Sequence, residues 1–558
     1  MRFLSFLLIL LMVHACAAAQ QKFTHADTLR GALSPERSCY DVRYEHLDVR
    51  IDPAKKSIGG SNTIEFTVDS SFSRMQVDLF ANLNINKVFL DDGSSAIPYD
   101  RDSNAFFLNL PQILQKGSRH SVKIYYWGTP IEAKRPPWEG GFTYRQDSSG
   151  NSWTVVTCQG TGASCWWPNK DHQSDEPDSM LISVTVPPGL EDVSNGRLRS
   201  TTSFSDGWTR FDWFVSYPIN NYDVTVNIGK FAHISDTYKS EGGKLTLDYY
   251  VLPYHEQEAR KQFKQAKQML KAFEKYFGPY PFIRDGYKLI ESPHNGMEHQ
   301  SAVAYGNRFL GGYVGRSSSA VGMKFDFIIV HESAHEWWGN SVTSKDVADM
   351  WIHESFGAYS EALFVEDVFG REEALTYINA KKQNVQNKQP IVGVYNVQNE
   401  GPGDMYDKGQ LVLNTLRSVI DNDKLWFSIL KGIQQTYRYQ TITYDTIVQY
   451  VNRATGKDFG PFLEQYLKKA ELPRLWVITW KKGDAVKARF KWVTDVNGFQ
   501  MPVKATISGK KFEWIYPTKE WQTIDLGIDS PEDFRIADRL FFVDYKFNYS
   551  YIDPRLPQ

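Results

Sequence analysis

Cysteine is scarce in this sequence, with four among 558 residues: Cys16, Cys39, Cys158 and Cys165. A chain of this length therefore does not depend on a disulfide framework for its stability. Cys158 and Cys165 are close enough in sequence to close a small loop. A disulfide between them and a pair of buried thiols both remain open as alternatives.

An excess of charge of either sign is also missing. The 63 Lys and Arg against 65 Asp and Glu give a net charge of −2. No basic excess points to nucleic acid, and no acidic tail points to a charge-driven partner. Hydrophobic residues at 42% and charged residues at 23% are ordinary for a soluble globular protein. The length exceeds what one hydrophobic core organises, so we expect roughly two to four domains.

Long apolar runs are confined to the beginning of the chain. Arg2, the apolar run 3–13 and the small residues Ala17–Ala19 predict a secretory signal peptide over residues 1–19. The stretch VHAC weakly resembles a bacterial lipobox, so lipid attachment at Cys16 is the alternative. No later segment has 18 continuous apolar residues, and we expect no membrane span. The expected location is periplasmic or extracellular, with a lipid anchor at the cell envelope as the alternative.

The hydrophobic period divides the rest of the chain into three segments. Residues 20–252 alternate in short runs such as SNTIEFTVDS, which predicts a large all-β domain. In residues 253–470 the period becomes helical, beginning with a helix of roughly six turns that ends at Gly278. Alternation returns in residues 471–558, which predicts a small β-sandwich.

The stretch HESAH places two histidines four residues apart within a helical pattern. Positions i and i+4 lie on one helix face, so His331 and His335 can reach one metal ion. Glu332 is rotated by about 100° from His331, which suits a base acting on water beside the metal. Imidazole nitrogen suits zinc, and two histidines with one carboxylate leave a position open for water. The apolar run before the motif predicts a buried helix, whose polar side chains need partners.

A third protein ligand is expected further along the chain. Eighteen residues separate His335 from Glu354. This length allows the first helix to end near Gly339–Asn340 and a second helix to begin near Asp346. Glu354 would then lie in the middle of the second helix.

The triplet His-Glu-Ser occurs at this second position as well, in HESFGAYSEA. His353 and Glu354 point about 100° apart on a helix and do not easily share one metal. Glu361 lies two turns beyond Glu354 on the same face and is the alternative carboxylate.

The spacing H-E-x-x-H, eighteen residues, then E resembles the gluzincin metallopeptidases, and specifically a secreted bacterial-type member of the aminopeptidase-N family. The flanking sequence HEWWGNSVTSKDVADMWIHESFGAYSEAL is similar to the family pattern. The resemblance implies one zinc ion per chain, held by His331, His335 and Glu354. The chain departs from the family at His353, where Asn is usual, and at Ser355, where Gly is usual. We interpret His353 as a neighbour that supports the metal ligands or only packs the helix.

Members of this family capture the substrate's free α-amine with the carboxylate of a G-x-M-E-N motif. The corresponding stretch here is HNGMEHQ. The resemblance implies that Glu298 anchors the amine and that the backbone of Gly296 and Met297 pairs with the substrate as an added strand. His299 stands where Asn is usual, and Asn295 stands in the Gly position.

Two further residues follow from the same resemblance. The segment TCQGTGASCWWPNK is similar to a β-domain region that provides a second amine contact, which implies Gln159, with Gln173 nearby. The family's Y-x-K-G motif appears as YDKG and supplies Tyr406. Its hydroxyl is expected to stabilise the oxyanion of the tetrahedral intermediate.

The resemblance covers most of the chain and implies a multidomain α+β fold. We expect an N-terminal all-β saddle domain, a thermolysin-like, mainly helical catalytic domain and a small C-terminal β-sandwich. The large C-terminal helical domain of many members has no counterpart, which predicts a more open cleft, or a cleft covered by a dimer or by insertions. The expected activity is zinc-dependent removal of the first residue from peptides, with Glu332 as the base. A zinc endopeptidase, a lipid-epoxide hydrolase and a non-catalytic peptide-binding protein are the alternatives. The preferred first residue, the natural substrate and the oligomeric state stay open.

Overall fold

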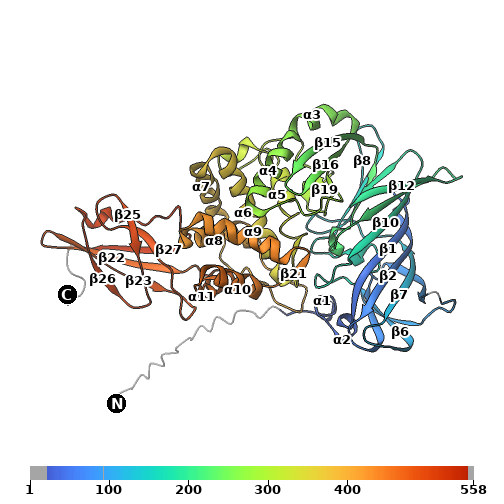
Figure 1. The fold of residues 1–558 in the computed structure, drawn as a ribbon, viewed down its shortest axis with the longest axis horizontal. Helices are drawn as coiled ribbons and strands as arrows, with labels where there is room; N and C mark the ends of the chain where they lie inside the picture. Colours follow the sequence, from blue (N-terminus) through green and yellow to red (C-terminus); the bar gives the residue numbers. More distant parts are fainter. Residues whose placement is uncertain (1–21, 92, 551–558) are drawn as a thin grey trace, which may run out of the picture.

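A computed structural model describes residues 22–91 and 93–550 of the chain (Figure 1). The predicted signal peptide and Cys16 lie outside the described residues. Figure 1 shows a β-rich N-terminal part, a helical middle and a β-rich end at the opposite side of the molecule. The predicted fold class is confirmed. None of the helices in the described ranges is long and apolar enough to cross a membrane.

The N-terminal part is built on alternation of buried and solvent-facing side chains. In the first strand Leu47, Val49 and Ile51 are buried, whereas Arg50 between them is exposed. The largest sheet has the order β12-β13-β10-β1-β2-β7-β4. Its strands are β1 Tyr40–Asp52, β2 Ser57–Val68, β4 Leu83–Leu90, β7 Arg119–Gly128, β10 Ser179–Val186, β12 Arg197–Ser203 and β13 Thr209–Val215. Two smaller sheets contain β3 Phe72–Asp78, β5 Tyr99–Asp102 and β6 Ala105–Leu114, and β8 Gly141–Gln146, β9 Ser152–Thr157, β11 Glu191–Ser194 and β14 Val226–Gly229.

Two short helices, α1 His25–Gly31 and α2 Pro35–Ser38, precede the first strand. Ser34 caps α2 by accepting from the Arg37 backbone N–H. The Arg37 side chain is fully buried and donates to both carboxylate oxygens of Asp78 at 2.7 Å. It also donates to the backbone carbonyls of Arg30 and Ala32. One guanidinium therefore fastens both helices to β3.

A mixed sheet crosses the expected boundary at residue 252. The strands β15 Ala232–Ser240 and β16 Gly243–Val251 join β17 Tyr287–Glu291, β18 Gly296–Met297 and β19 Val303–Tyr305 in the order β15-β16-β17-β19-β18. Leu245 and Leu247 pack in the same hydrophobic core as the helices that follow. These two strands thus belong structurally with the helical middle, because β16 pairs in parallel with β17.

The helical middle contains α3 Glu256–Gln262, α4 Lys264–Phe277, α5 Phe327–Ala334, α6 Trp351–Phe369, α7 Arg371–Asn379, α8 Asp404–Ile420, α9 Asp423–Tyr437, α10 Tyr444–Thr455 and α11 Gly460–Leu467, with a two-stranded sheet of β20 Val342–Ser344 and β21 Gln440–Ile442. The single helix predicted up to Gly278 is divided at Phe263 into α3 and α4. Gly278 ends α4 with a positive φ of 94°, as predicted for a C-terminal glycine.

The two helices that carry the repeated triplet are shorter than predicted. Helix α5 ends at Ala334 rather than near Gly339, and His335 is its C-terminal cap residue. Helix α6 begins at Trp351 rather than near Asp346, because Asp346 instead caps a short 3₁₀ turn. Glu354 therefore lies in the first turn of α6 and not in its middle.

The C-terminal part contains the sheet β26-β23-β22-β27 and the pair β24–β25. Its strands are β22 Arg474–Lys482, β23 Ala485–Val493, β24 Val503–Thr506, β25 Phe512–Ile515, β26 Gln522–Leu526 and β27 Asp544–Ser550. The Tyr466 hydroxyl of α11 donates to the Phe542 carbonyl at 2.6 Å, which joins this part to the helices.

In the N-terminal part the Sγ atoms of Cys158 and Cys165 lie 3.9 Å apart and form no disulfide.

Candidate active site

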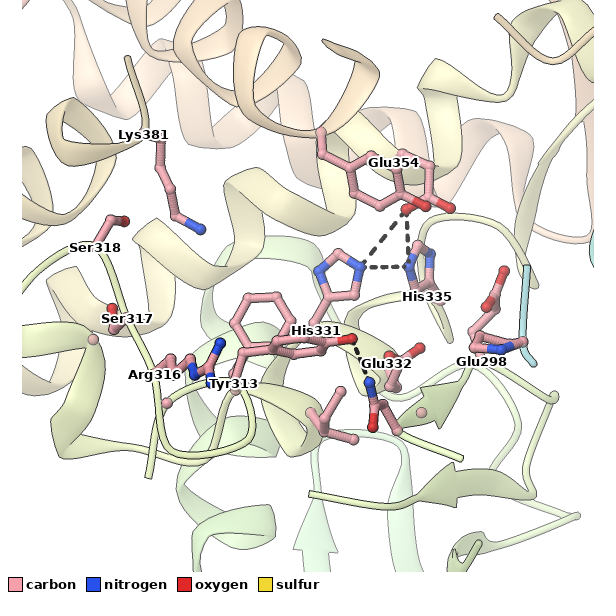
Figure 2. Close-up of a pocket in the computed structure, with 18 of the residues that line it drawn as sticks. Glu298, Tyr313, Arg316, Ser317, Ser318, His331, Glu332, His335, Glu354 and Lys381 are labelled. Carbon is pink, nitrogen blue, oxygen red and sulfur yellow. Dashed lines mark hydrogen bonds and ion pairs between the residues drawn. The ribbon is translucent and has the colours of Figure 1, made fainter. Parts of the chain in front are cut away.

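The structure brings His331, His335 and Glu354 together, as the motif spacing predicts (Figure 2). The two Nε2 atoms lie 3.4 Å apart. Glu354 Oε2 lies 3.7 Å from His331 Nε2 and 3.6 Å from His335 Nε2. Atoms that bind one tetrahedral zinc ion at about 2.1 Å lie about 3.4 Å from one another. The three donor atoms thus have the separation that a zinc ion requires.

The hydrogen bonds behind these donors fit a metal as well. His331 Nδ1 contacts Glu361 Oε1 at 2.7 Å, and His335 Nδ1 donates to the Trp338 carbonyl at 2.9 Å. With the proton on Nδ1, each Nε2 lone pair is available to a cation. Glu354 Oε2 is buried and has no hydrogen-bond partner among the described residues. An unpaired buried carboxylate oxygen is costly, and a metal ion removes that cost.

Electrostatics keep Glu354 in the form that binds a cation. Burial alone would raise the pKa of Glu354, but without a metal ion the positive charge of protonated His335 and His331 lowers the pKa to about 2. Glu361, the alternative third ligand, does not fill that position. Its Oε1 contacts His331 and its Oε2 accepts from the Tyr377 hydroxyl at 2.5 Å. It lies behind His331 and orients the imidazole ring.

A glycine on α6 makes room for the metal-binding helix. A Cβ atom on Gly357 would lie 2.9 Å from Cε1 of His335. Such a contact is closer than real Cβ atoms show, so the ring could not keep its place beside a larger residue. The glycine in HESFG thus permits α5 and α6 to approach at the site.

Glu332, the predicted base, lies beside the edge strand β18. A Cβ atom on Gly296 would lie 2.4 Å from Glu332 Oε1, so only glycine leaves space for this carboxylate. Burial raises the pKa of Glu332 to about 8; His331 opposes this shift, and the charge of Glu298 adds to it. A carboxyl group poised near neutral pH is suited to accept a proton and return it.

The predicted amine anchor lies next to the base. One oxygen of Glu298, one of Glu332 and one ring nitrogen of His335 lie within 4.8 Å of one another. Gln159 Nε2 donates to Glu298 Oε1 and to Glu354 Oε1, both at 3.0 Å. Gln159 therefore links the anchor to the metal site from the N-terminal β part, and its neighbour Gln173 instead accepts from Ser344 Oγ at 2.9 Å.

Tyr406 also lines this pocket. Its ring stacks on the ring of His331, with centroids 5.9 Å apart. Burial and the nearby charge of Glu354 raise the pKa of Tyr406 well above its usual value, which keeps the phenol protonated as a donor. Behind it, a Cβ on Gly409 would lie 2.0 Å from Ser355 Oγ. The glycine of YDKG thus accommodates the serine that replaces the family's usual glycine.

His353 and His299 both stand where the family pattern has Asn, and their surroundings differ. His353 is fully buried and bonded on both ring nitrogens, to Ser344 and to Tyr222. His299 is 1% exposed, and neither of its ring nitrogens has a partner among the described residues. We have no physical account of that unpaired ring.

The pocket has a volume of about 450 Å³ and two chemically distinct ends. Figure 2 shows Glu298, Glu332 and Glu354 at one end and Arg316, Ser317, Ser318 and Lys381 away from them. Sequence reasoning missed Arg316, Lys381 and Tyr222. Arg316 and Lys381 line the pocket and Tyr222 contacts Glu298 only through tertiary folding, and no local motif marks them.

Comparison with known proteins agrees with this geometry. Residues 261–466 match the model of the peptidase family M1 domain. The chain therefore carries an M1 peptidase domain, and the resemblance to the aminopeptidase-N family is confirmed. The matched segment includes every predicted metal ligand, together with Glu298, Glu332 and Tyr406.

Relatives with curated names are aminopeptidases. Probable aminopeptidase 2 of Sulfurisphaera tokodaii is 23% identical over 391 residues, which cover 66% of this chain and 48% of that protein. Leucyl aminopeptidase of Saccharolobus solfataricus is 23% identical over 349 residues, which cover 59% and 43%. The chain thus spans about half the length of the curated relatives it matches.

Solved structures of an M1 zinc metallopeptidase from Deinococcus radiodurans share the fold. One of them, bound to a Tyr-Ser-Ala substrate, has a TM-score of 0.66 and 18% sequence identity. The alignment covers 80% of this chain and 98% of that one.

Proposed function

We propose that this protein is a zinc-dependent aminopeptidase that removes the first residue of peptides. The observation that carries the proposal is the position of Glu298. Its carboxylate lies beside the base Glu332 and the metal donor His335. A substrate whose free amine binds there has its first peptide bond at the base and the metal. The aminopeptidase names of the relatives support the same reaction.

His331, His335 and Glu354 would hold the zinc ion. When bound, zinc supplies a Lewis acid that polarises the scissile carbonyl and lowers the pKa of water. Glu332 takes the proton from the attacking water and returns it to the departing amine. A positioned general base of this kind contributes roughly 10²–10⁴-fold to the rate.

The remaining pocket residues hold the substrate and its developing charge. Tyr406 donates a hydrogen bond from its phenol to the oxyanion. Removing a contact of this kind typically lowers kcat by roughly 10²–10³-fold. Glu298, fixed by Gln159, accepts hydrogen bonds from the N-terminal ammonium. The strand β18 lies at the edge of its sheet, and its Gly296 and Met297 backbone is available to pair with the substrate.

A panel of aminoacyl fluorogenic substrates tests the proposal. Each substrate is assayed with a free and with an N-acetylated α-amine, before and after treatment with a chelator and after zinc is added back. We expect cleavage of the free-amine forms only, loss with chelator and recovery with zinc. Cleavage of acetylated substrates would favour a zinc endopeptidase. Peptide binding without any cleavage would favour the non-catalytic alternative.

The variant Glu298→Gln sharpens the test, because it keeps the shape of the side chain and removes its charge. We expect KM for free-amine substrates to rise by tenfold or more, since hydrogen bonds to charged groups are worth about 1.5–3 kcal/mol. Zinc content should be unchanged. Unaltered kinetics would exclude Glu298 as the anchor.

A further inference from the structure

His353 lies beside a metal ligand but has no part in the proposed reaction. Its ring is fully buried in the first turn of α6. Nε2 lies 2.9 Å from the backbone N–H of Ser344. An N–H group only donates, so Nε2 carries no proton. In the neutral ring the proton is therefore on Nδ1, which makes Nδ1 a donor.

A series of hydrogen bonds leads from His353 through Tyr222 to Glu298, the proposed amine anchor. His353 Nδ1 lies 3.3 Å from the Tyr222 hydroxyl oxygen, which accepts from it. The two rings lie nearly parallel, with an interplanar angle of 25°. The Tyr222 proton is then directed to Glu298 Oε1, at 3.2 Å. Each group donates in one direction, from Ser344 through His353 and Tyr222 to Glu298. We call this chain of hydrogen bonds the relay.

The relay leaves one oxygen of the anchor available. Tyr222 and Gln159 both donate to Glu298 Oε1, so neither of these side chains occupies Oε2. A carboxylate held at one oxygen by two donors has a fixed plane. Its second oxygen then has a defined direction in which it can accept from an ammonium group.

We propose that His353 is a positioning residue for the amine site, acting through Tyr222 on Glu298. This inference rests on the proposed function, because it takes Glu298 as the anchor of the substrate amine. It explains why a histidine serves here where the related pattern has asparagine. An imidazole ring bonds Ser344 and Tyr222 at the same time through nitrogens on its two sides. The shorter asparagine side chain has only the position that corresponds to Nδ1.

A matched pair of variants separates the two bonds of His353. His353→Asn keeps a donor near the position of Nδ1 and loses the contact with Ser344. His353→Gln keeps an acceptor near the position of Nε2 and loses the bond to Tyr222. Tyr222→Phe removes the last hydroxyl of the relay and keeps the ring packing.

The readout is the selectivity of inhibitors for the α-amine. We measure the Ki of an amino-acid hydroxamate and of its des-amino analogue, and divide the Ki of the des-amino analogue by that of the hydroxamate. We expect this ratio to fall by about tenfold in Tyr222→Phe and His353→Gln, and by less in His353→Asn. The double variant His353→Gln/Tyr222→Phe should be no worse than either single variant, since both break one relay. Zinc content and thermal unfolding are measured on each variant.

The outcomes distinguish this inference from the proposed function. If the wild-type protein does not discriminate between the two inhibitors, the proposed amine anchor itself fails. If the wild type discriminates and the ratio is unchanged in Tyr222→Phe and His353→Gln, only the relay is wrong. A parallel loss of affinity for both inhibitors would assign His353 a purely structural role and overturn the inference. Tyr222→Phe keeps the test decisive if the His353 variants do not fold.

Discussion

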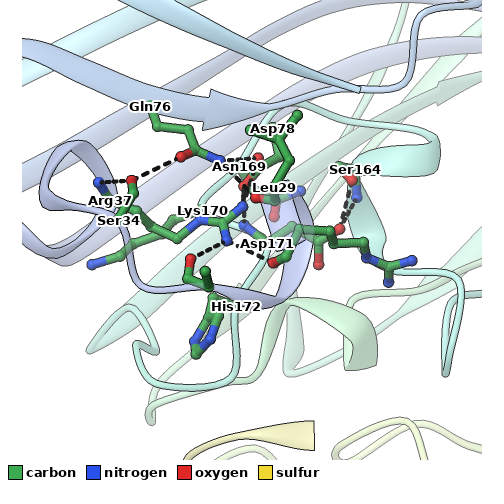
Figure 3. Close-up of polar contacts among 12 residues, drawn as sticks. Leu29, Ser34, Arg37, Gln76, Asp78, Ser164, Asn169, Lys170, Asp171 and His172 are labelled. Carbon is green, nitrogen blue, oxygen red and sulfur yellow. Dashed lines mark hydrogen bonds and ion pairs between the residues drawn. The ribbon is translucent and has the colours of Figure 1, made fainter. Parts of the chain in front are cut away.

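Two buried clusters of charge in this protein are balanced in opposite ways. Around Arg37 the guanidinium meets Asp78 within the chain, so its charge is matched internally (Figure 3). In the pocket, three glutamates that are no more than 8% exposed converge: Glu298, Glu332 and Glu354. A buried ion pair is complete without a ligand. An excess of buried carboxylate needs cations from outside, a role that zinc and a substrate ammonium would fill under the proposed function.

Two of these glutamates, Glu332 and Glu354, come from the two copies of the repeated triplet. In the first copy His331 contributes a donor atom to the candidate metal group and Glu332 lies beside Gly296 of β18. In the second copy Glu354 faces the metal position and His353 faces Tyr222. The same three letters therefore take different roles because they begin at different points of two crossing helices.

The largest expected effect belongs to the base. Glu332→Gln cannot accept a proton, so we expect kcat to fall by roughly 10²–10⁴-fold while bound zinc stays at one per chain. Glu354→Gln is the control from the other triplet. It should lose zinc as well as activity, measured by metal analysis of the purified protein. A Glu332→Gln enzyme of full activity would contradict the assigned roles.

At the buried Arg37–Asp78 pair we expect substitution to change stability rather than activity. Arg37→Met leaves Asp78 buried without its partner, so the free energy of unfolding should fall by about 3–5 kcal/mol. Urea unfolding followed by circular dichroism measures this change. The double variant Arg37→Met/Asp78→Leu should recover part of the loss, because no unpaired charge remains. Equal loss in the single and double variants would show that the charge is not the cause.

Local sequence pattern was sufficient to predict that three side chains able to bind a metal converge, and to predict the order of the regions. The i, i+4 spacing fixes the face of His331 and His335, and the eighteen-residue gap allows Glu354 to return to them. Helix ends were less predictable. Asp346 begins a 3₁₀ turn rather than α6, because the chain between the helices also forms the short strand β20.

What the sequence could not predict depends on contacts between distant segments. Tyr222 lies 76 positions before Glu298, and Arg37 lies 41 before Asp78. Neither pair has a spacing that reports proximity. Glu361 was correctly placed on the face of Glu354, but only the crossing of α5 and α6 decides that it meets His331 Nδ1 rather than the metal position.

An intermediate effect is expected at Glu361, which lies behind the candidate metal ligand His331. Glu361→Gln keeps an acceptor for His331 Nδ1 but removes the charge that makes the imidazole a better ligand. Zinc affinity should fall by roughly 10–100-fold, measured by competition with a chromophoric chelator. Tyr377→Phe is the matched control, because it removes only the hydroxyl that donates to Glu361. A smaller decrease is expected there. Unchanged affinity in Glu361→Gln would show that the charge does not tune the metal.

The smallest expected effect lies at the cationic end of the pocket. Arg316 is exposed, and its guanidinium forms no ion pair within residues 22–91 and 93–550. It lines a pocket whose other end is acidic, so under the proposed function we expect it to attract the C-terminal carboxylate of a short peptide. Because exposed charges interact weakly, Arg316→Gln should raise KM for tripeptides by about two- to fivefold. Amidated tripeptides should be unaffected, and the difference should disappear at high salt. An equal change for acid and amide would mean that Arg316 contacts the peptide in another way.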